Sequence, residues 1–142
     1  MDPRTFKAIR NAIEHEKESI DMYNKLAAKL EGPAREFCFQ MVIEEERHKG
    51  MLESLGAADL ERMQEKLDRL GAYHIDIPFQ KKDTVEELFR IARAREKASV
   101  EMYSQYARES DGDLKRFFTS MKEEEERHLE LLDDAIARYK AI

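Results

Sequence analysis

Cysteine is nearly absent from this 142-residue sequence, and its scarcity excludes several kinds of site. Cys38 is the single cysteine, so no disulfide can form within the chain. Because no Cys-x-x-Cys motif is present, the chain cannot by itself build a zinc ribbon or a rubredoxin-type iron site. The sequence therefore offers no set of thiolates that would favour a soft metal ion.

Glycine, proline and tryptophan are also scarce, whereas charged residues are abundant. The chain has 5 Gly, 3 Pro and no Trp, and 39% of its residues are charged. A composition rich in Glu, Lys, Arg, Leu and Ala is typical of long amphipathic helices. The net charge is −6, with both signs interspersed. Because there is no basic stripe, we expect neither nucleic acid nor an anionic membrane as a partner.

Targeting and membrane signals are missing as well. No apolar run approaches the roughly 20 residues of a membrane-spanning helix, and residues 1–7 lack the basic-then-apolar pattern of a signal peptide. We therefore expect a cytoplasmic protein. The length suits one domain, which we expect to span residues 1–142.

An internal repeat organises the chain. A shift of 80 residues aligns residues 12–53 with residues 92–133 without gaps, and 16 of the 42 aligned pairs are identical. Both copies contain Ala-x-x-x-Glu-Lys-x-Ser-x-x-Met-Tyr, and both contain Glu-Glu-Glu-Arg-His, at residues 44–48 and 124–128. The sequence is therefore a duplication, and we expect both copies to fold alike.

Each copy is predicted to form a helical hairpin. Apolar residues recur at helical spacing in four stretches, and residues 32–33 and 111–113 mark the two turns. We expect the first helix to begin at Asp2. Asp83 is the predicted N-cap of the third helix, with Glu86 as its capping-box partner.

A longer connection, at residues 57–82, separates the hairpins. Residues 57–70 have a helical pattern, and residues 74–79 are predicted to be extended because Pro78 disfavours a helix. Two antiparallel hairpins joined by one long crossover predict an all-α, ferritin-like four-helix bundle.

Glutamate and histidine recur at a spacing that suits a metal site. In each copy a Glu-x-x-His pair places two side chains one helical turn apart, and a further glutamate lies on the partner helix. The six residues are Glu16, Glu45, His48, Glu96, Glu125 and His128. Carboxylates combined with imidazoles suit iron or manganese. Four carboxylates in a dry core need compensating charge, which two divalent cations would supply.

Tyrosine follows each first-helix glutamate at a distance of seven residues, which is about two helical turns. Tyr23 therefore shares a face with Glu16, and Tyr103 shares a face with Glu96. Their hydroxyls are placed to hydrogen-bond a ligand carboxylate one layer away. The alternative is that both tyrosines are ordinary core residues.

These motifs resemble the ferritin-like di-iron family, and most closely its rubrerythrin-type proteins. Glu-x-x-Ser-x-x-x-Tyr followed by Glu-x-x-His, present twice, carries the resemblance across nearly the whole chain apart from the crossover. The resemblance implies two iron ions, with manganese or zinc as alternatives. It also implies that Glu45 and Glu125 bridge the two metals and that Glu16 and Glu96 are terminal ligands. His48 and His128 would each bind one metal.

Two departures from rubrerythrins bear on function. Full-length rubrerythrins carry a C-terminal rubredoxin domain, whereas this sequence ends with its fourth helix, so we expect a separate electron-donor protein. Rubrerythrins also have an extra glutamate on the third helix, where this chain has Ser99. That carboxylate is tied to the metal movement behind peroxide reduction, so Ser99 argues against efficient peroxidase activity.

Three functions remain open at this point. The leading one is an oxidoreductase that reduces hydrogen peroxide or dioxygen at a binuclear metal site. The second is iron handling, either as a ferroxidase or in storage, and the third is a non-enzymatic helical module stabilised by metal. The long crossover favours a homodimer, in which the two chains could exchange hairpins.

The remaining titratable and sulfur-containing residues have simpler expected roles. Surface exposure is predicted for His15 and for the glutamates beside the ligands, which are Glu44, Glu46, Glu123, Glu124 and Glu126. Cys38 is predicted to be a small buried hydrophobic residue. Met22, Met41, Met102 and Met121 are predicted to fill the core.

Overall fold

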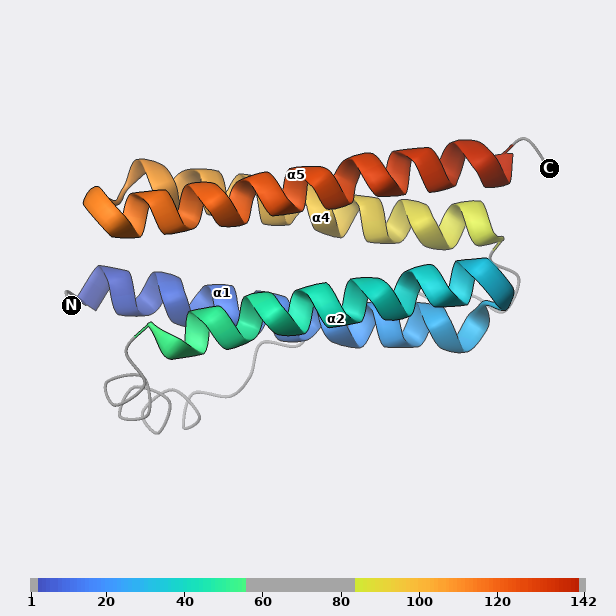
Figure 1. Cartoon of the computed structure of the whole chain (residues 1–142), viewed down its shortest axis with the longest axis horizontal. Helices are drawn as coiled ribbons and strands as arrows, with labels where there is room; N and C mark the ends of the chain where they lie inside the picture. The colour runs from blue at the N-terminus through green and yellow to red at the C-terminus, as the bar shows by residue number, and fades with distance from the viewer. Residues whose placement is uncertain (1–2, 56–83, 141–142) are drawn as a thin grey trace.

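The structure is a computed structural model that describes residues 3–55 and 84–140. It contains four long helices in this part of the chain: α1 (Pro3–Lys29), α2 (Gly32–Ser54), α4 (Val85–Arg108) and α5 (Gly112–Lys140). Helices α1 and α2 form one antiparallel hairpin and α4 and α5 form the other, and the hairpins lie side by side (Figure 1). The predicted four-helix bundle is confirmed. The predicted crossover, with His74, lies outside the described residues.

The two hairpin turns are built alike. Gly32 and Gly112 occupy equivalent positions of the repeat, with φ angles of 58° and 59°. This left-handed conformation is accessible to glycine because it has no Cβ. Pro33 follows directly and is tolerated because the first backbone N–H groups of a helix have no partner within the helix. Both turns therefore lie where the sequence predicted them.

The start of α4 differs by one residue from the prediction. Thr84 is the N-cap: its hydroxyl accepts a hydrogen bond from the backbone N–H of Glu87, and the Glu87 carboxylate accepts one from the backbone N–H of Thr84. The prediction of Asp83 with Glu86 was wrong because the sequence offers two capping boxes one residue apart. The second of these forms in the structure.

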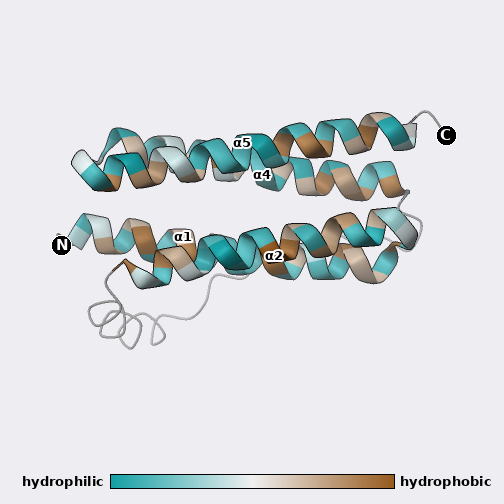
Figure 2. Cartoon of the chain, in the orientation of Figure 1, coloured by the Kyte–Doolittle hydropathy of each residue, from teal (hydrophilic) through white to brown (hydrophobic). Residues whose placement is uncertain are grey.

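The core consists of two apolar clusters with a polar layer between them. One cluster surrounds Leu26 and Phe89, and the other surrounds Ile9 and Phe118. In Figure 2 the middle of α2 and of α5 is largely hydrophilic, and more hydrophobic segments lie to either side. Cys38 is fully buried, and the four methionines predicted for the core lie in these clusters or pack against them: Met22, Met41, Met102 and Met121.

None of the described helices is long and apolar enough to cross a membrane.

Candidate metal centre

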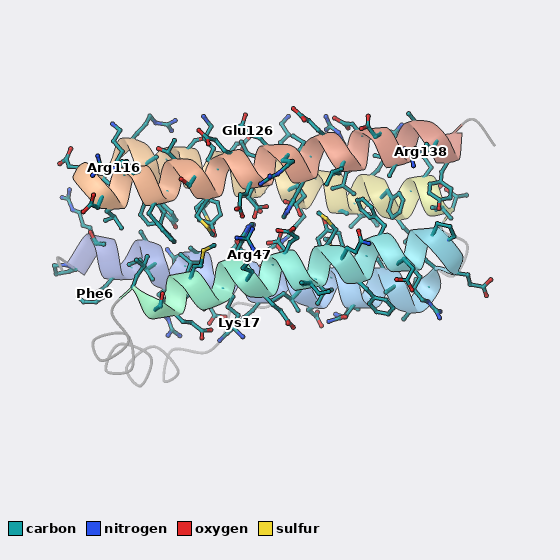
Figure 3. The ribbon with its side chains drawn as sticks, in the orientation of Figure 1. Phe6, Lys17, Arg47, Arg116, Glu126 and Arg138 are labelled. Atoms are coloured by element: carbon teal, nitrogen blue, oxygen red, sulfur yellow. The ribbon has the colours of Figure 1, made fainter. Side chains whose placement is uncertain are left out.

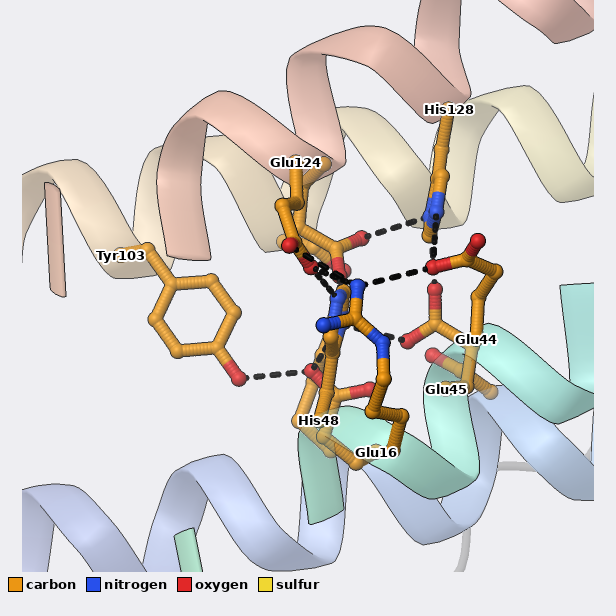
Figure 4. A network of polar contacts seen from close by, with 12 residues as sticks. Glu16, Glu44, Glu45, His48, Tyr103, Glu124 and His128 are labelled. Atoms are coloured by element: carbon orange, nitrogen blue, oxygen red, sulfur yellow. Dashed lines mark hydrogen bonds and ion pairs between the residues drawn. The ribbon is translucent and has the colours of Figure 1, made fainter. Parts of the chain in front are cut away.

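The polar layer contains all six predicted ligands, which meet at the middle of the bundle (Figure 4). Each helix contributes, so the site depends on the assembled bundle and not on one hairpin. None of the six residues exposes more than 2% of its surface: Glu16 of α1, Glu45 and His48 of α2, Glu96 of α4, and Glu125 and His128 of α5. Glu16 and Glu96 therefore point inward, as their spacing from Tyr23 and Tyr103 predicted.

Atoms of the six predicted ligands form two overlapping groups, in each of which all atoms lie within 4.8 Å of one another. Both of these groups contain the same two glutamates. The first group also contains Glu16 and His48, and the second also contains Glu96 and His128. The shared pair is Glu45 and Glu125. Two adjacent cation positions with two common carboxylates follow from this arrangement. A third such group joins the half-buried Glu44 to His48 and His128.

Distances within the site obey the symmetry of the repeat. Nδ1 of His48 lies 2.7 Å from Glu125 Oε1, and Nδ1 of His128 lies 2.9 Å from Glu45 Oε1. Two ligand atoms bound at right angles to one metal ion, each at about 2.1 Å, would lie about 3 Å apart. Each histidine thus approaches the central glutamate of the opposite hairpin at a separation that suits a common metal ion.

Hydrogen bonding gives a direct test of whether these residues fit a metal. Within residues 3–55 and 84–140, the buried side-chain nitrogen and oxygen atoms without a hydrogen-bond partner all belong to the six residues. They include both carboxylate oxygens of Glu45 and Glu125 and the Nδ1 atom of each histidine. Buried polar atoms are normally paired, because an unpaired one costs about 1–3 kcal/mol. Eight such atoms around one point fit a pair of cations.

The two tyrosines connect the hairpins at this level. Tyr23 of α1 donates a hydrogen bond of 2.7 Å to Oε1 of Glu96 on α4. Tyr103 of α4 donates one of 2.6 Å to Oε1 of Glu16 on α1. In both glutamates the second oxygen, Oε2, has no hydrogen-bond partner. Each tyrosine thus fixes one oxygen of a glutamate and leaves the other available to a cation.

Comparison with known proteins agrees with this geometry. A family model described as Rubrerythrin matches residues 7–136. The chain belongs to the rubrerythrin family. A crystal structure of a ferritin-like, diiron-carboxylate protein from Bacillus anthracis str. Ames has the same fold, with a TM-score of 0.64 and 24% sequence identity, covering 96% of this chain and 99% of that chain. No curated protein matches the sequence.

The electrostatics of the site show a crowding of buried carboxylates that cations could balance. Burial, followed by the nearby charge of Glu45, raises the pKa of Glu16 well above its ordinary value. Burial and the charge of Glu96 raise the pKa of Glu125 to about 8. Burial lowers the pKa of His128, but the surrounding carboxylates outweigh it and raise that pKa to about 12. Without metal, protons on these groups must balance the carboxylate charge.

His15 is not a surface residue, contrary to the prediction. It lies partly buried between α1 and α4, where its Nε2 is 2.5 Å from Ser99 Oγ and its Nδ1 is 2.9 Å from the Arg95 guanidinium. Burial and then the charge of Arg95 lower its pKa to about 3. His15 directly precedes Glu16, and successive residues of a helix are rotated by about 100°. His15 therefore points away from the ligands, but it points toward α4 and not toward solvent.

Ser99, which replaces the extra glutamate of rubrerythrins, is part of the same contact. Ser99 is 1% exposed, and its hydroxyl oxygen contacts Nε2 of His15. The same hydroxyl donates a hydrogen bond to the backbone oxygen of Arg95. Arg95 also donates to Ser19. Hydrogen bonds between α1 and α4 therefore occupy the place where rubrerythrins have a carboxylate.

Glu124 is the residue beside the site that the sequence prediction missed. Surface exposure was predicted for Glu124, but its side chain is only 22% exposed. Its carboxylate forms an ion pair with Arg47 at 2.9 Å and also contacts Nε2 of His48. Glu46, Glu123 and Glu126 are exposed as predicted. The available signal was that the motif at residues 44–48 recurs unchanged at residues 124–128, although only two of its five positions are ligands.

Proposed function

We propose that this protein holds two iron ions in the bundle and acts as an oxidoreductase that reduces hydrogen peroxide or dioxygen. The convergence on one point of eight buried atoms that lack a hydrogen-bond partner is the observation that carries the proposal. Membership of the rubrerythrin family and the duplicated Glu-x-x-His motif support it. The proposed metal ligands are those of the sequence prediction: Glu16, Glu45, His48, Glu96, Glu125 and His128.

The donor set suits the proposed ions. Four carboxylates and two imidazoles are hard or intermediate ligands of the kind that bind iron and manganese. A reduced pair of iron ions would supply two electrons, which together with two protons convert one hydrogen peroxide to two waters. Manganese and zinc remain alternatives for the resident metal, because zinc also binds these ligands.

The chain itself supplies a rigid and dry surrounding. The apolar clusters on either side of the polar layer keep bulk water away from the ligands, which strengthens every charge interaction among them. Tyr23 and Tyr103 hold Glu96 and Glu16 in fixed orientations, so little reorganisation is needed when a cation binds. Because the ligands are at most 2% exposed, a small oxidant is the proposed substrate.

Electrons are proposed to come from a separate donor protein. A single cysteine cannot form a rubredoxin-type site, so this sequence offers no second iron site of that kind for supplying them.

Peroxide consumption by the iron-loaded protein with a reduced donor tests the proposal. The variant Glu45→Ala/Glu125→Ala removes both shared carboxylates, and its rate is expected to fall to that of the donor alone. Glu46→Ala/Glu126→Ala is the matched control, because it removes two exposed glutamates at equivalent positions of the repeat. Equal rates for the wild type and Glu45→Ala/Glu125→Ala would refute the proposed activity.

A further inference from the structure

We propose that the two metal positions are supported unequally: Glu124 holds His48 in its ligating orientation, whereas His128 lacks equivalent support from Glu44. The position served by His48 then binds its metal ion first and more tightly. This inference rests on the metal centre of the proposed function. It concerns the contacts on the outer side of the two histidines, away from the shared carboxylates.

His48 and His128 present the same atoms to the site. Their rings are stacked, with centroids 5.5 Å apart and planes 12° apart. Each Nδ1 faces the buried carboxylates, and each Nε2 faces the opposite way, toward a glutamate of the other hairpin. The glutamate facing His48 is Glu124 and the one facing His128 is Glu44, which occupy equivalent positions of the repeat. The sequence alone would therefore make the two halves equal.

The outer contact of His48 is a hydrogen bond. Nε2 of His48 contacts a carboxylate oxygen of Glu124. A proton held on Nε2 by this carboxylate leaves the lone pair of Nδ1 free to bind a metal ion. A carboxylate on the far nitrogen of a ligating histidine also fixes the ring orientation and makes the histidine a better donor.

The outer contact of His128 is much looser. Its Nε2 lies 3.9 Å from Oε2 of Glu44, which is longer than a hydrogen bond. Glu44 is also 45% exposed at its side chain, compared with 22% for Glu124. Water competes for an exposed carboxylate, so Glu44 constrains the ring of His128 less than Glu124 constrains the ring of His48.

Arg47 contacts the two glutamates unequally. Its side chain lies between α2 and α5 (Figure 3). One guanidinium nitrogen donates hydrogen bonds of 2.9 Å to both carboxylate oxygens of Glu124. The same nitrogen donates one of 3.1 Å to Glu44. Arg47 therefore holds the carboxylate of Glu124, which belongs to α5, beside His48. Its contact with Glu44 lies within its own helix, α2.

The equivalent arginine of the other hairpin does not repeat this arrangement. The Arg127 side chain is 61% exposed, and its guanidinium lies 3.9 Å from the Glu124 of its own helix. The two arginines therefore differ in their contacts, although both copies of the motif read Glu-Glu-Glu-Arg-His. One arginine serves the His48 side of the site.

A cobalt(II) titration under anaerobic conditions, followed by visible absorption with a competing chelator, tests the inequality. The wild type is expected to bind two ions in two resolved steps. Loss of an outer carboxylate typically weakens metal binding by about 10- to 100-fold. Glu124→Ala is expected to weaken the tighter step by this amount. Glu44→Ala removes the same charge at the equivalent position and is expected to weaken either step by less than about threefold.

The identity of the affected histidine can be read from NMR of the cobalt-loaded protein. The ring N–H protons of ligating histidines are shifted by the paramagnetic ion, and a hydrogen-bonded N–H exchanges slowly with water. The wild type is expected to show one slowly exchanging ring N–H, from His48. Glu124→Ala should make it exchange fast, and Glu124→Gln, which keeps an acceptor oxygen, should restore part of the protection. A structural role of Glu124 alone would not give this pattern.

Three outcomes would overturn the inference. Equal weakening in Glu124→Ala and Glu44→Ala would show that only the removed charge matters. Unchanged affinities in Glu124→Ala would show that its contact with His48 does not support metal binding. Absence of cobalt binding by the wild type would refute the metal centre itself. That failure can be told apart from failure of the inference, because the first two outcomes are observed only when the wild type binds cobalt.

Discussion

A buried carboxylate destabilises the folded chain unless a cation or a proton balances its charge. Glu16 is fully buried, and its raised pKa reflects the loss of water and the nearby Glu45. Its neighbour Glu14 on the same helix lies nearer the surface, where it pairs with Lys17. The two glutamates therefore differ in what they contribute to folding, although they are two residues apart.

Glu16→Gln is expected to stabilise the metal-free protein and to weaken metal binding. The substitution removes a buried carboxylate while keeping an oxygen that can accept the Tyr103 hydrogen bond. The free energy of unfolding of chelator-treated protein, measured with urea, should rise by about 1 kcal/mol. Glu14→Gln serves as the control and should change it by less than about 0.5 kcal/mol. A clear loss of stability in Glu16→Gln would contradict the account.

Cys38 is expected to be unreactive in the folded protein. It is fully buried, and burial raises the pKa of its thiol to about 12. Since the thiolate is the reactive form, about one thiol in ten thousand is ionised at pH 8. Labelling with a thiol reagent at pH 8 should be slow in buffer and fast in denaturant. Fast labelling of the folded chain would show that the core opens around α2.

At the scale of elements, most of the fold could be predicted from the sequence because the signals are local. Glycine at equivalent positions of the repeat located both hairpin turns, and the apolar spacing located the helices. The start of α4 was shifted by one residue because neighbouring capping boxes compete. His15 and Glu124 were misplaced for another reason: each contacts a different helix, and helical spacing alone does not tell which helix lies opposite.

Glycine substitutions at two positions of α2 are expected to have opposite signs. Gly32 has φ +58°, so Gly32→Ala forces an L side chain into a left-handed conformation and should cost about 1 kcal/mol. Gly50 lies inside the helix, and an added Cβ would meet nothing within 4 Å. Gly50→Ala should therefore stabilise the protein by about 0.5–1 kcal/mol. Thermal unfolding of both variants checks the pair, and the same sign for both would contradict the described geometry.

At the scale of the whole molecule, the candidate site could be predicted because the duplication doubles every signal. A lone Glu-x-x-His is common in a chain that is 39% charged, but two copies in register with two further glutamates are not. The inequality of the two halves could not be predicted in this way. It arises from how Arg47 and Arg127 pack, and their sequence surroundings are alike.

The oligomeric state separates the proposed oxidoreductase from an iron-storage protein. We expect a homodimer, so light scattering should give twice the chain mass of 16.7 kDa. Storage requires a hollow shell of many subunits. A mass of many chains, with far more than two iron ions for each, would contradict the homodimer and favour storage. A monomer at micromolar concentration would contradict the homodimer alone.

Iron content per chain tests the central claim most directly. Protein loaded with ferrous iron under anaerobic conditions and freed of excess metal should contain about two irons per chain by elemental analysis, as the two overlapping ligand groups require. Glu45→Ala/Glu125→Ala should lose this iron, and Glu46→Ala/Glu126→Ala should retain it. A wild type without stoichiometric metal, or equal iron content in both double variants, would contradict the claim that these buried carboxylates and histidines form a di-iron centre.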